Sequence, residues 1–305
     1  MAKTIKFNLV CNETAIRNLE DLRNNFVIED VLAYYNNKLL HRWLEVRGYL
    51  TELEKVSAIT CEESVGIIKE LIKIFDVVSD EKKVEERVYM LDYLQERRKL
   101  CSIYEEQNFK TKTIVDDYET GYRQLVEGIL SNPDDVARIK ANIAEMAENY
   151  KWVLEMNHRS LFYTLKEKSA LAVMCLLMNE DLRKYYLPIE TKSEDGSIVS
   201  DLDANADKAI MYQEICDMIR NSAFRAALGD NLLSFAGETE GYWKDLEPKG
   251  KKYMITYIAR GSFVRSAGVT GGDLSSVDVV NKFVIVDGID YKSNSAQQVI
   301  RYMEV

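Results

Sequence analysis

Proline and glycine are scarce in this sequence, with only 3 Pro and 14 Gly among 305 residues. Sandwiches and propellers need many turns, which these two residues supply, so their scarcity argues against an all-β fold. Because domains usually have ~100–200 residues, a chain of this length with 47% hydrophobic residues can bury one large core or two ordinary ones. The composition predicts a globular protein built on long helices.

Long apolar runs are also in short supply, and the 50 acidic residues outnumber the 40 basic ones. The net charge is −10, whereas proteins that bind nucleic acid by releasing counterions are usually basic, so nucleic acid is not indicated as a partner. The most apolar run, residues 169–178, has about half of the ~20 residues that a membrane span needs, and the first residues lack a signal-peptide pattern. We therefore expect a cytoplasmic protein without membrane association.

The cysteines form no pattern of a disulfide framework or a zinc ribbon. They are odd in number, far apart and never spaced as C-x-x-C: Cys11, Cys61, Cys101, Cys175 and Cys216. Such cysteines are typical of a reducing compartment. No cofactor is expected.

Local patterns predict a compact beginning of the chain. Residues 3–10 alternate apolar and polar side chains, which is the period of a half-buried strand, and whether this strand joins the C-terminal β segment stays open. Asn18 is expected to cap a first short helix. Two more short helices are expected over residues 28–35 and 39–47, with Gly48 at the C-cap of the second.

The same region resembles an opening helical module of many uncharacterised bacterial proteins. The likeness rests on the pattern F-x-I-x-D-V-L-x-Y-Y followed by L-x-R-W-L-x-x-R-G-Y, formed by Phe26, Ile28, Asp30, Val31, Leu32, Tyr34, Tyr35, Leu40, Arg42, Trp43, Leu44, Arg47, Gly48 and Tyr49. It covers about the first sixth of the chain. The resemblance implies a bacterial or phage origin and a compact helical element, and it carries over no catalytic residue.

Apolar residues then recur three or four positions apart, which predicts a series of amphipathic helices. These helices are expected over residues 62–77 and 80–107, from 113 onward, and from Asn132 as cap with Pro133 in the first turn. Residues 160–187 are apolar on nearly every side, so we expect one central core helix that Pro188 ends. A polar loop over 190–205 is the expected domain boundary, and a helix over 206–220 follows.

After residue 237 the pattern becomes that of β-strands. Residues 253–259 and 263–265 flank Arg260-Gly261, and residues 283–286 and 289–292 flank Asp287-Gly288, so two hairpins are expected. Residues 298–305 fit a strand or a terminal helix about equally well, and we favour the strand. The predicted class is α+β, a predominantly α-helical bundle with a small C-terminal antiparallel β-sheet. The expected domains are a strand and short-helix module (1–55), a helical bundle (56–189), and a helix with the β segment (190–305).

The residues of nucleophilic and phosphate-binding chemistry are few and lack the usual motifs. His41 and His158 are the only histidines, and without a nucleophile motif each is interpreted as structural rather than as a general base. Cys101 lies beside basic residues, which favour a thiolate, yet its helical context favours a packing role. The glycine-rich loop 268–276 lacks the P-loop and dinucleotide patterns, and is interpreted as a connection between strands.

One segment resembles the start of a calcium-binding loop. Asp201, Asp203 and Asn205 place oxygen ligands at positions one, three and five. Ala206 stands where the turn glycine belongs, and Tyr212 stands where the bidentate glutamate belongs. A helix start capped by an Asx residue explains the same residues, and we prefer that interpretation.

Two groups of aromatic and charged residues are candidates for binding a partner. Arg42, Trp43 and Arg47 form one group and Tyr242 and Trp243 the other, and all belong to types that are enriched at interface hot spots. For Trp43, core packing is the competing interpretation. Tyr242 and Trp243 lie in a connection, where binding residues are common.

Two functional hypotheses from different classes follow. The first is a non-enzymatic bacterial or phage accessory or regulatory protein that binds another macromolecule, namely a protein, with an acidic surface that suits a basic partner. The alternative is a metal-dependent hydrolase or nuclease-like effector, related to defence, that uses dispersed Asp and Glu from the 50 acidic residues. Whether the chain forms oligomers is open.

Overall fold

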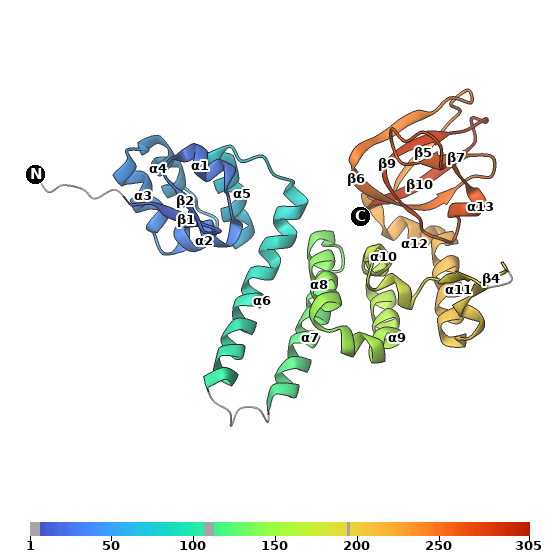
Figure 1. The fold of residues 1–305 in the computed structure, drawn as a ribbon, viewed down its shortest axis with the longest axis horizontal. Helices are drawn as coiled ribbons and strands as arrows, with labels where there is room; N and C mark the ends of the chain where they lie inside the picture. Colours follow the sequence, from blue (N-terminus) through green and yellow to red (C-terminus); the bar gives the residue numbers. More distant parts are fainter. Residues whose placement is uncertain (1–6, 107–112, 194–195) are drawn as a thin grey trace, which may run out of the picture. The chain divides into compact units, whose positions relative to one another are not determined.

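The computed structural model describes residues 7–106, 113–193 and 196–305, which form two compact units. Unit 1 comprises the described residues of Met1–Gly128 with Lys140–Asn142, and unit 2 comprises those of Ile129–Ile139 and Ile143–Val305. Helices dominate, and a six-stranded antiparallel sheet is formed near the C-terminus (Figure 1). The predicted α+β class is confirmed. No helix of the described residues is long and apolar enough to cross a membrane.

The first elements of the chain are a two-stranded hairpin and a set of short helices. They are β1 (Leu9–Cys11), β2 (Thr14–Ile16), α1 (Leu19–Asn24), α2 (Ile28–Asn36), α3 (Leu39–Arg47), α4 (Leu50–Ser57) and α5 (Ser64–Phe75). Longer helices follow: α6 (Glu81–Glu106), α7 (Ile114–Ser131) and α8 (Val136–Asn149). The predicted helices are observed, and α4 was not predicted.

The hairpin settles where the described part of the first predicted strand pairs. Leu9 pairs with Ile16 and Cys11 with Thr14, and the turn between them has positive φ at Asn12 (45°) and Glu13 (65°). A two-residue turn between right-twisted strands requires positive φ at both of its residues. The strand therefore pairs locally and does not join the C-terminal sheet; residues 1–6 of the prediction lie outside the described residues.

Several helix ends are set by the residues that the sequence indicates. The Asn18 side chain accepts the Asp21 amide at 2.8 Å, and Gly48 ends α3 with φ 81°, so both predicted caps are confirmed. The predicted cap at Asn132 is wrong, because α8 begins at Val136 and the Asp135 carboxylate accepts the Arg138 amide at 3.0 Å. The residues before Asp135 form a turn instead of the first turn of the helix.

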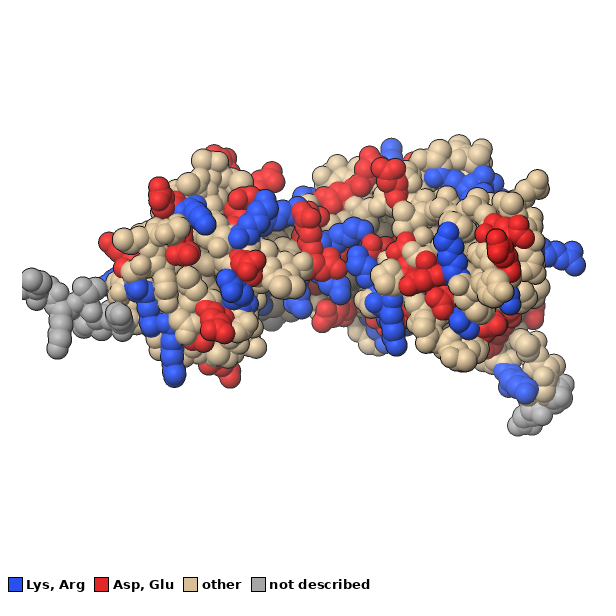
Figure 2. Space-filling model, turned by 90° about the horizontal axis from the view of Figure 1, so that it is seen from above, with Lys and Arg blue, Asp and Glu red and all other residues tan. Residues whose placement is uncertain are grey.

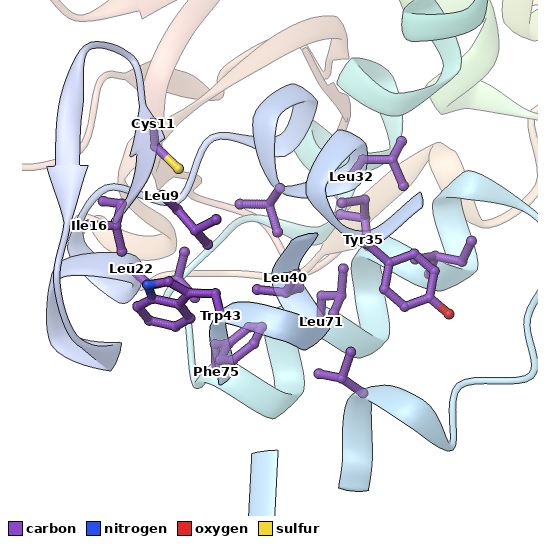
Figure 3. Packing of buried hydrophobic residues seen from close by; sticks show 14 of the residues in the cluster. Leu9, Cys11, Ile16, Leu22, Leu32, Tyr35, Leu40, Trp43, Leu71 and Phe75 are labelled. Carbon is purple, nitrogen blue, oxygen red and sulfur yellow. The ribbon is translucent and has the colours of Figure 1, made fainter. Parts of the chain in front are cut away.

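A continuous hydrophobic core holds the first part of unit 1 together. Trp43 has no exposed surface, and its indole lies beside Leu22, Leu40 and Phe75 (Figure 3). The Tyr49 ring packs against the Trp43 indole, with 5.7 Å between the two ring centroids. No described residue accepts a hydrogen bond from Trp43 Nε1. Burial of the large ring therefore stabilises this core despite an unpaired N–H group.

The remaining elements of unit 2 are a helical part and the six-stranded sheet. The helical part contains α9 (Lys151–Lys168), α10 (Ala170–Met178), η2 (Arg183–Tyr185), β3 (Glu190–Lys192), β4 (Ile198–Ser200), η3 (Asp201–Asp203), α11 (Ala206–Arg220), α12 (Ser222–Ala227) and η4 (Gly229–Asn231). The sheet part contains β5 (Leu233–Ala236), β6 (Lys244–Ile258), β7 (Phe263–Arg265), β8 (Leu274–Ser275), α13 (Ser276–Val279), β9 (Ile285–Lys292) and β10 (Val299–Glu304).

The single central helix expected over residues 160–187 is wrong. Ser169 is extended (φ −145°, ψ 111°), and its hydroxyl accepts the Ala172 amide at 3.0 Å while donating to the Pro133 carbonyl at 2.6 Å. This cap ends α9 and starts α10. All residues from Leu171 to Met178 are buried, so the predicted core position is confirmed for α10. The expected loop at 190–205 also contains the β3–β4 hairpin and η3.

The six-stranded sheet has the order β5-β10-β6-β9-β7-β8, which corrects both predicted hairpins. Strands β6 and β7 flank Arg260-Gly261 but both pair with β9, and β9 runs straight through Asp287-Gly288. Gly288 has φ 63°, and a Cβ there would lie 2.8 Å from the Glu247 carbonyl oxygen. Glycine thus allows β9 to pass an irregular stretch of β6 at close range. The predicted last strand is confirmed as β10.

Replacing Trp43 by Ala should lower the free energy of unfolding of unit 1 by about 3–5 kcal/mol, because the ring leaves a cavity in a closed core. Trp43→Phe should cost less, since it keeps an aromatic ring and removes the unpaired N–H. Native-state hydrogen exchange of peptides from α1–α5 measures the change. Trp152→Ala is the control: this ring is 69% exposed, and its loss should change stability by only about 0.5 kcal/mol. Unchanged hydrogen exchange of α1–α5 in the Trp43→Ala variant would contradict the role of Trp43 in this core.

Candidate functional site

The outer face of the C-terminal sheet carries a charged pair between neighbouring strands. Val264 and Tyr291 are a cross-strand pair without exposed surface, so their side chains point into the core of the sheet. Side chains alternate along a strand, and the next pair, Arg265 and Asp290, therefore points to the opposite face. The same alternation places Phe263 and Lys292 on that outer face.

Arg265 is held on three sides. Its Nε donates to Asp290 Oδ2 at 3.2 Å, one terminal nitrogen lies 3.6 Å from Asp273 Oδ1, and the guanidinium carbon lies 3.9 Å from the Trp243 ring centroid. The Arg265 and Asp290 side chains are only 16% and 11% exposed. A planar cation fits both a carboxylate and an aromatic face, so these contacts fix the orientation of Trp243.

The turn before β6 exposes Tyr242, which directly precedes Trp243 in the chain. Tyr242 is 75% exposed, and its amide donates to the Thr239 carbonyl at 2.8 Å. Thr239 is joined to Ser293, directly after β9, by three hydrogen bonds. Its hydroxyl donates to the Ser293 carbonyl at 3.2 Å and accepts the Ser293 amide at 3.0 Å, and its own amide donates to the same carbonyl at 3.3 Å. The backbone that carries the aromatic pair is therefore attached to the sheet.

A second cation, Lys292, lies near the rings of Trp243 and Phe263. Lys292 Nζ lies 5.8 Å from the Trp243 centroid and 6.0 Å from that of Phe263. We call Tyr242, Trp243, Phe263, Arg265 and Lys292 the aromatic–cation cluster. Exposed tyrosine and half-buried tryptophan on a fixed backbone can bind another surface with little loss of conformational entropy.

Of the three candidates on α3, only Arg42 is exposed. Trp43 belongs to the core of unit 1. Arg47 donates to the Phe7 carbonyl at 2.9 Å, to Asn8 Oδ1 at 2.6 Å and to the Arg17 carbonyl, so its guanidinium holds the beginning of the chain to α3. Arg42 borders a shallow depression that His41 also lines. The helix thus presents one arginine to solvent.

The calcium-like segment is a capped helix start. Asn205 Oδ1 accepts the Lys208 amide at 3.0 Å, and Asp203 is exposed. Asp201 Oδ2 lies 2.5 Å from Lys208 Nζ, while its Oδ1 accepts the Ile189 amide at 2.8 Å. Within the residues described, no three His, Cys, Asp or Glu side chains form a group that could hold a metal ion.

The remaining candidates make contacts within their own units. Burial, followed by the charge of Lys38, lowers the pKa of His41. His158 stacks on Tyr185 with 4.8 Å between centroids, and its Nδ1 lies 3.1 Å from the Leu154 carbonyl. Cys101 is exposed on α6, so the packing role expected for it is wrong, and all five cysteines are free. In the glycine-rich loop, which connects β7 with β8, the Gly268 amide donates to Asp290 Oδ2 at 3.3 Å.

Two groups of surface residues were missed by the sequence analysis. Arg265 and Lys292 complete the aromatic–cation cluster, and the alternation of Phe263-Val264-Arg265 around an apolar residue was the signal that could have placed Arg265 opposite the core. On α9, Trp152 is 69% and Met156 is 83% exposed, one helical turn apart. Helical spacing alone could not distinguish these two residues from core residues.

Comparison of the chain with protein-family models, with curated proteins and with solved structures finds no match in any of the three.

Arg265→Met should destabilise unit 2 by about 2–4 kcal/mol, because it leaves Asp290 largely buried without its cation. Urea unfolding at neutral pH measures the loss. The matched control is Arg260→Met, which changes an exposed arginine of the same sheet unit and should cost no more than about 0.5 kcal/mol. Equal effects of the two substitutions would contradict a structural role for the Arg265 pair.

Asp201→Asn should destabilise unit 2 at neutral pH and lose this effect in acid. Burial alone would raise the pKa of Asp201, but hydrogen bonds from Lys208 Nζ and the Ile189 amide outweigh it and hold the pKa below its ordinary value. The carboxylate therefore contributes stability above its unfolded pKa of about 3.9, and the contribution disappears as pH falls through the folded pKa. Urea midpoints of both proteins, measured from neutral pH downward, should converge. A constant difference at all pH values would contradict the prediction.

Proposed function

We propose that this chain is a non-enzymatic accessory or regulatory protein that binds another protein in the cytoplasm. The contact surface is the aromatic–cation cluster of unit 2. The observation that carries the proposal is the exposed Tyr242, which directly precedes Trp243 in the chain, together with the Arg265 guanidinium 3.9 Å from the Trp243 ring centroid. The bacterial or phage origin implied by the likeness of the first residues remains part of this proposal.

The chemistry of the cluster supports a protein partner. Tryptophan, tyrosine and arginine are the residues most enriched at interface hot spots, where a few anchors provide most of the affinity. Here the anchors need little ordering on binding, because the turn of Tyr242 is hydrogen-bonded to the end of β9 and Trp243 is stacked on Arg265. Preorganisation of this kind reduces the entropic cost of association.

The charge of the chain is distributed in a way that fits this assignment. Residues 233–305 carry nine acidic and nine basic side chains, so the excess of negative charge lies outside the C-terminal sheet segment. On the face seen in Figure 2, acidic and basic side chains are interspersed. A net charge of −10 attracts a basic partner over long range, while the neutral sheet provides the short-range contact.

The alternative of a metal-dependent hydrolase has no observation in its favour. The 50 acidic residues offered dispersed carboxylates for such a reaction. In the described parts of the chain, they do not form a group that could hold a metal ion.

Photo-crosslinking at position 242 tests the proposal. A benzophenone amino acid in place of Tyr242, in the full chain and in the native host, should give a discrete adduct that protease removes and nuclease leaves intact. The same amino acid in place of Val277, which is 79% exposed on α13 of the same unit, is the matched control and should give none. No adduct at 242, equal adducts at both positions, or an adduct removed by nuclease would contradict the proposal.

Tyr242→Ala should weaken binding to the crosslinked partner by about 2 kcal/mol, as loss of a hot-spot residue does. Isothermal calorimetry with the purified partner measures the affinity. Val277→Ala provides the comparison, and circular dichroism checks that both variants are folded. Unchanged affinity of the Tyr242 variant would place the contact elsewhere.

A further inference from the structure

The β3–β4 hairpin of unit 2 exposes apolar side chains on a very short sheet. Ile198 is 71%, Val199 45% and Ile189 46% exposed. The two strands pair only with each other among the described residues, so both outer edges present unpaired backbone groups. A two-stranded sheet with exposed apolar residues is marginal in water unless something covers it.

The base of the hairpin is firmly attached to the unit. The Asp201 amide donates to the Ile189 carbonyl at 3.2 Å, and the Asp201 carboxylate binds the buried Lys208. Lys208 Nζ also donates to the Lys184 carbonyl at 2.6 Å. The hairpin is therefore presented in a defined position at its base rather than as a free loop.

The hydrogen-bonding pattern identifies the groups that each edge leaves free. The Ser193 amide donates to the Ser197 carbonyl at 2.9 Å, and the Asp201 amide donates to the Ile189 carbonyl. Each of these is therefore a hydrogen-bonded pair of the ladder. Because such pairs alternate along an antiparallel ladder, Thr191 and Val199 form the hydrogen-bonded pair between them. The N–H and C=O groups of the two intervening pairs consequently point outward: Glu190 and Lys192 on β3, Ile198 and Ser200 on β4.

The two edges differ in their protection against pairing. On β3 the outward groups belong to two charged residues. Charged side chains, lysine above all, commonly prevent an edge strand from pairing with another chain. On β4 they belong to Ile198 and Ser200, with the apolar Val199 between them. This edge has no charge, no proline and no bulge within its three residues.

We propose that β4 pairs antiparallel with β4 of a second copy of this chain. A two-fold axis beside Val199 places this residue opposite its symmetry mate and pairs the free groups of Ile198 with those of Ser200 of the other copy. Side chains that face each other then lie on the same face of the sheet, as an antiparallel ladder requires. The result is a four-stranded sheet in the order β3-β4-β4-β3.

A second copy of the chain meets the requirements of this edge. The axis brings together two β-branched valines and duplicates no charge across the contact. The new outer edges are the two β3 strands, whose Glu190 and Lys192 prevent further addition. The assembly thus stops at two copies, which a chain with two unguarded edges would not do.

Proline substitutions at matched positions test the edge assignment. Ile198 and Lys192 face each other in the hairpin, and the N–H group of each points outward, so proline at either position leaves the β3–β4 pairing intact. Ile198→Pro should weaken dimerisation of the full chain by about tenfold or more, because symmetry doubles the loss of each hydrogen bond. Lys192→Pro should leave the dimer unchanged in sedimentation velocity. A wild type that is monomeric at every concentration, or equal loss in both variants, overturns the proposal.

A cysteine at the axis gives a second, independent readout. In a chain carrying Cys61→Ser and Cys101→Ser, Val199→Cys should form a disulfide-linked dimer under mild oxidation, since opposed residues of a non-hydrogen-bonded pair have Cα atoms about 4.5 Å apart. Thr191→Cys is the control, because the two Thr191 residues would lie about 14 Å apart across three strand spacings. No crosslink at 199, or an equal crosslink at 191, overturns the pairing.

Discussion

The ion pair between Arg265 and Asp290 organises the outer face of the C-terminal sheet. Asp290 accepts both the Arg265 guanidinium and the Gly268 amide, so it joins β7, β9 and the glycine-rich loop. The guanidinium in turn supports the Trp243 ring. Two largely buried charges are stable here because each has a partner at hydrogen-bond distance, and removal of one would leave the other without compensation.

Two tryptophans of similar local sequence illustrate how packing decides a role. Trp43 and Trp243 each have a basic residue as a direct neighbour in the chain and another within reach of the ring. Trp43 lies on the helix face that closes the core of unit 1, and it has no exposed surface. Trp243 precedes a strand whose outer face is open, and it keeps part of its ring accessible. Both residues are tryptophans, and their exposure differs because apolar neighbours surround Trp43 and not Trp243.

The hairpin and the aromatic–cation cluster represent different ways for a surface to bind. The cluster offers side chains on a fixed backbone, whereas β4 offers backbone groups that no side chain can replace. The first mode depends on the chemistry of a few anchors, and the second depends on an edge that lacks guards. In the two proposals the surfaces have separate roles, one toward another protein and one toward a second copy.

The sequence by itself determined the class of the fold, most helices and several of their ends. Asn18 and Gly48 could be recognised because a cap depends on one side chain or one backbone conformation in its immediate neighbourhood. The same local logic located the buried segment that became α10, whereas the last residues fitted a strand or a helix about equally well. Apolar period and turn residues act over a few positions, so sequence patterns report them directly.

Only the tertiary structure decided which strands pair and which side chains meet. Asp287-Gly288 has the sequence of a hairpin turn, yet β9 passes through it because β6 approaches Gly288 too closely for any side chain. Ser169 divides an apolar run because its hydroxyl finds the Pro133 carbonyl, 36 positions away. Arg265 meets Trp243 only through the order of β6, β9 and β7. These contacts join residues distant in the chain, and no local pattern encodes them.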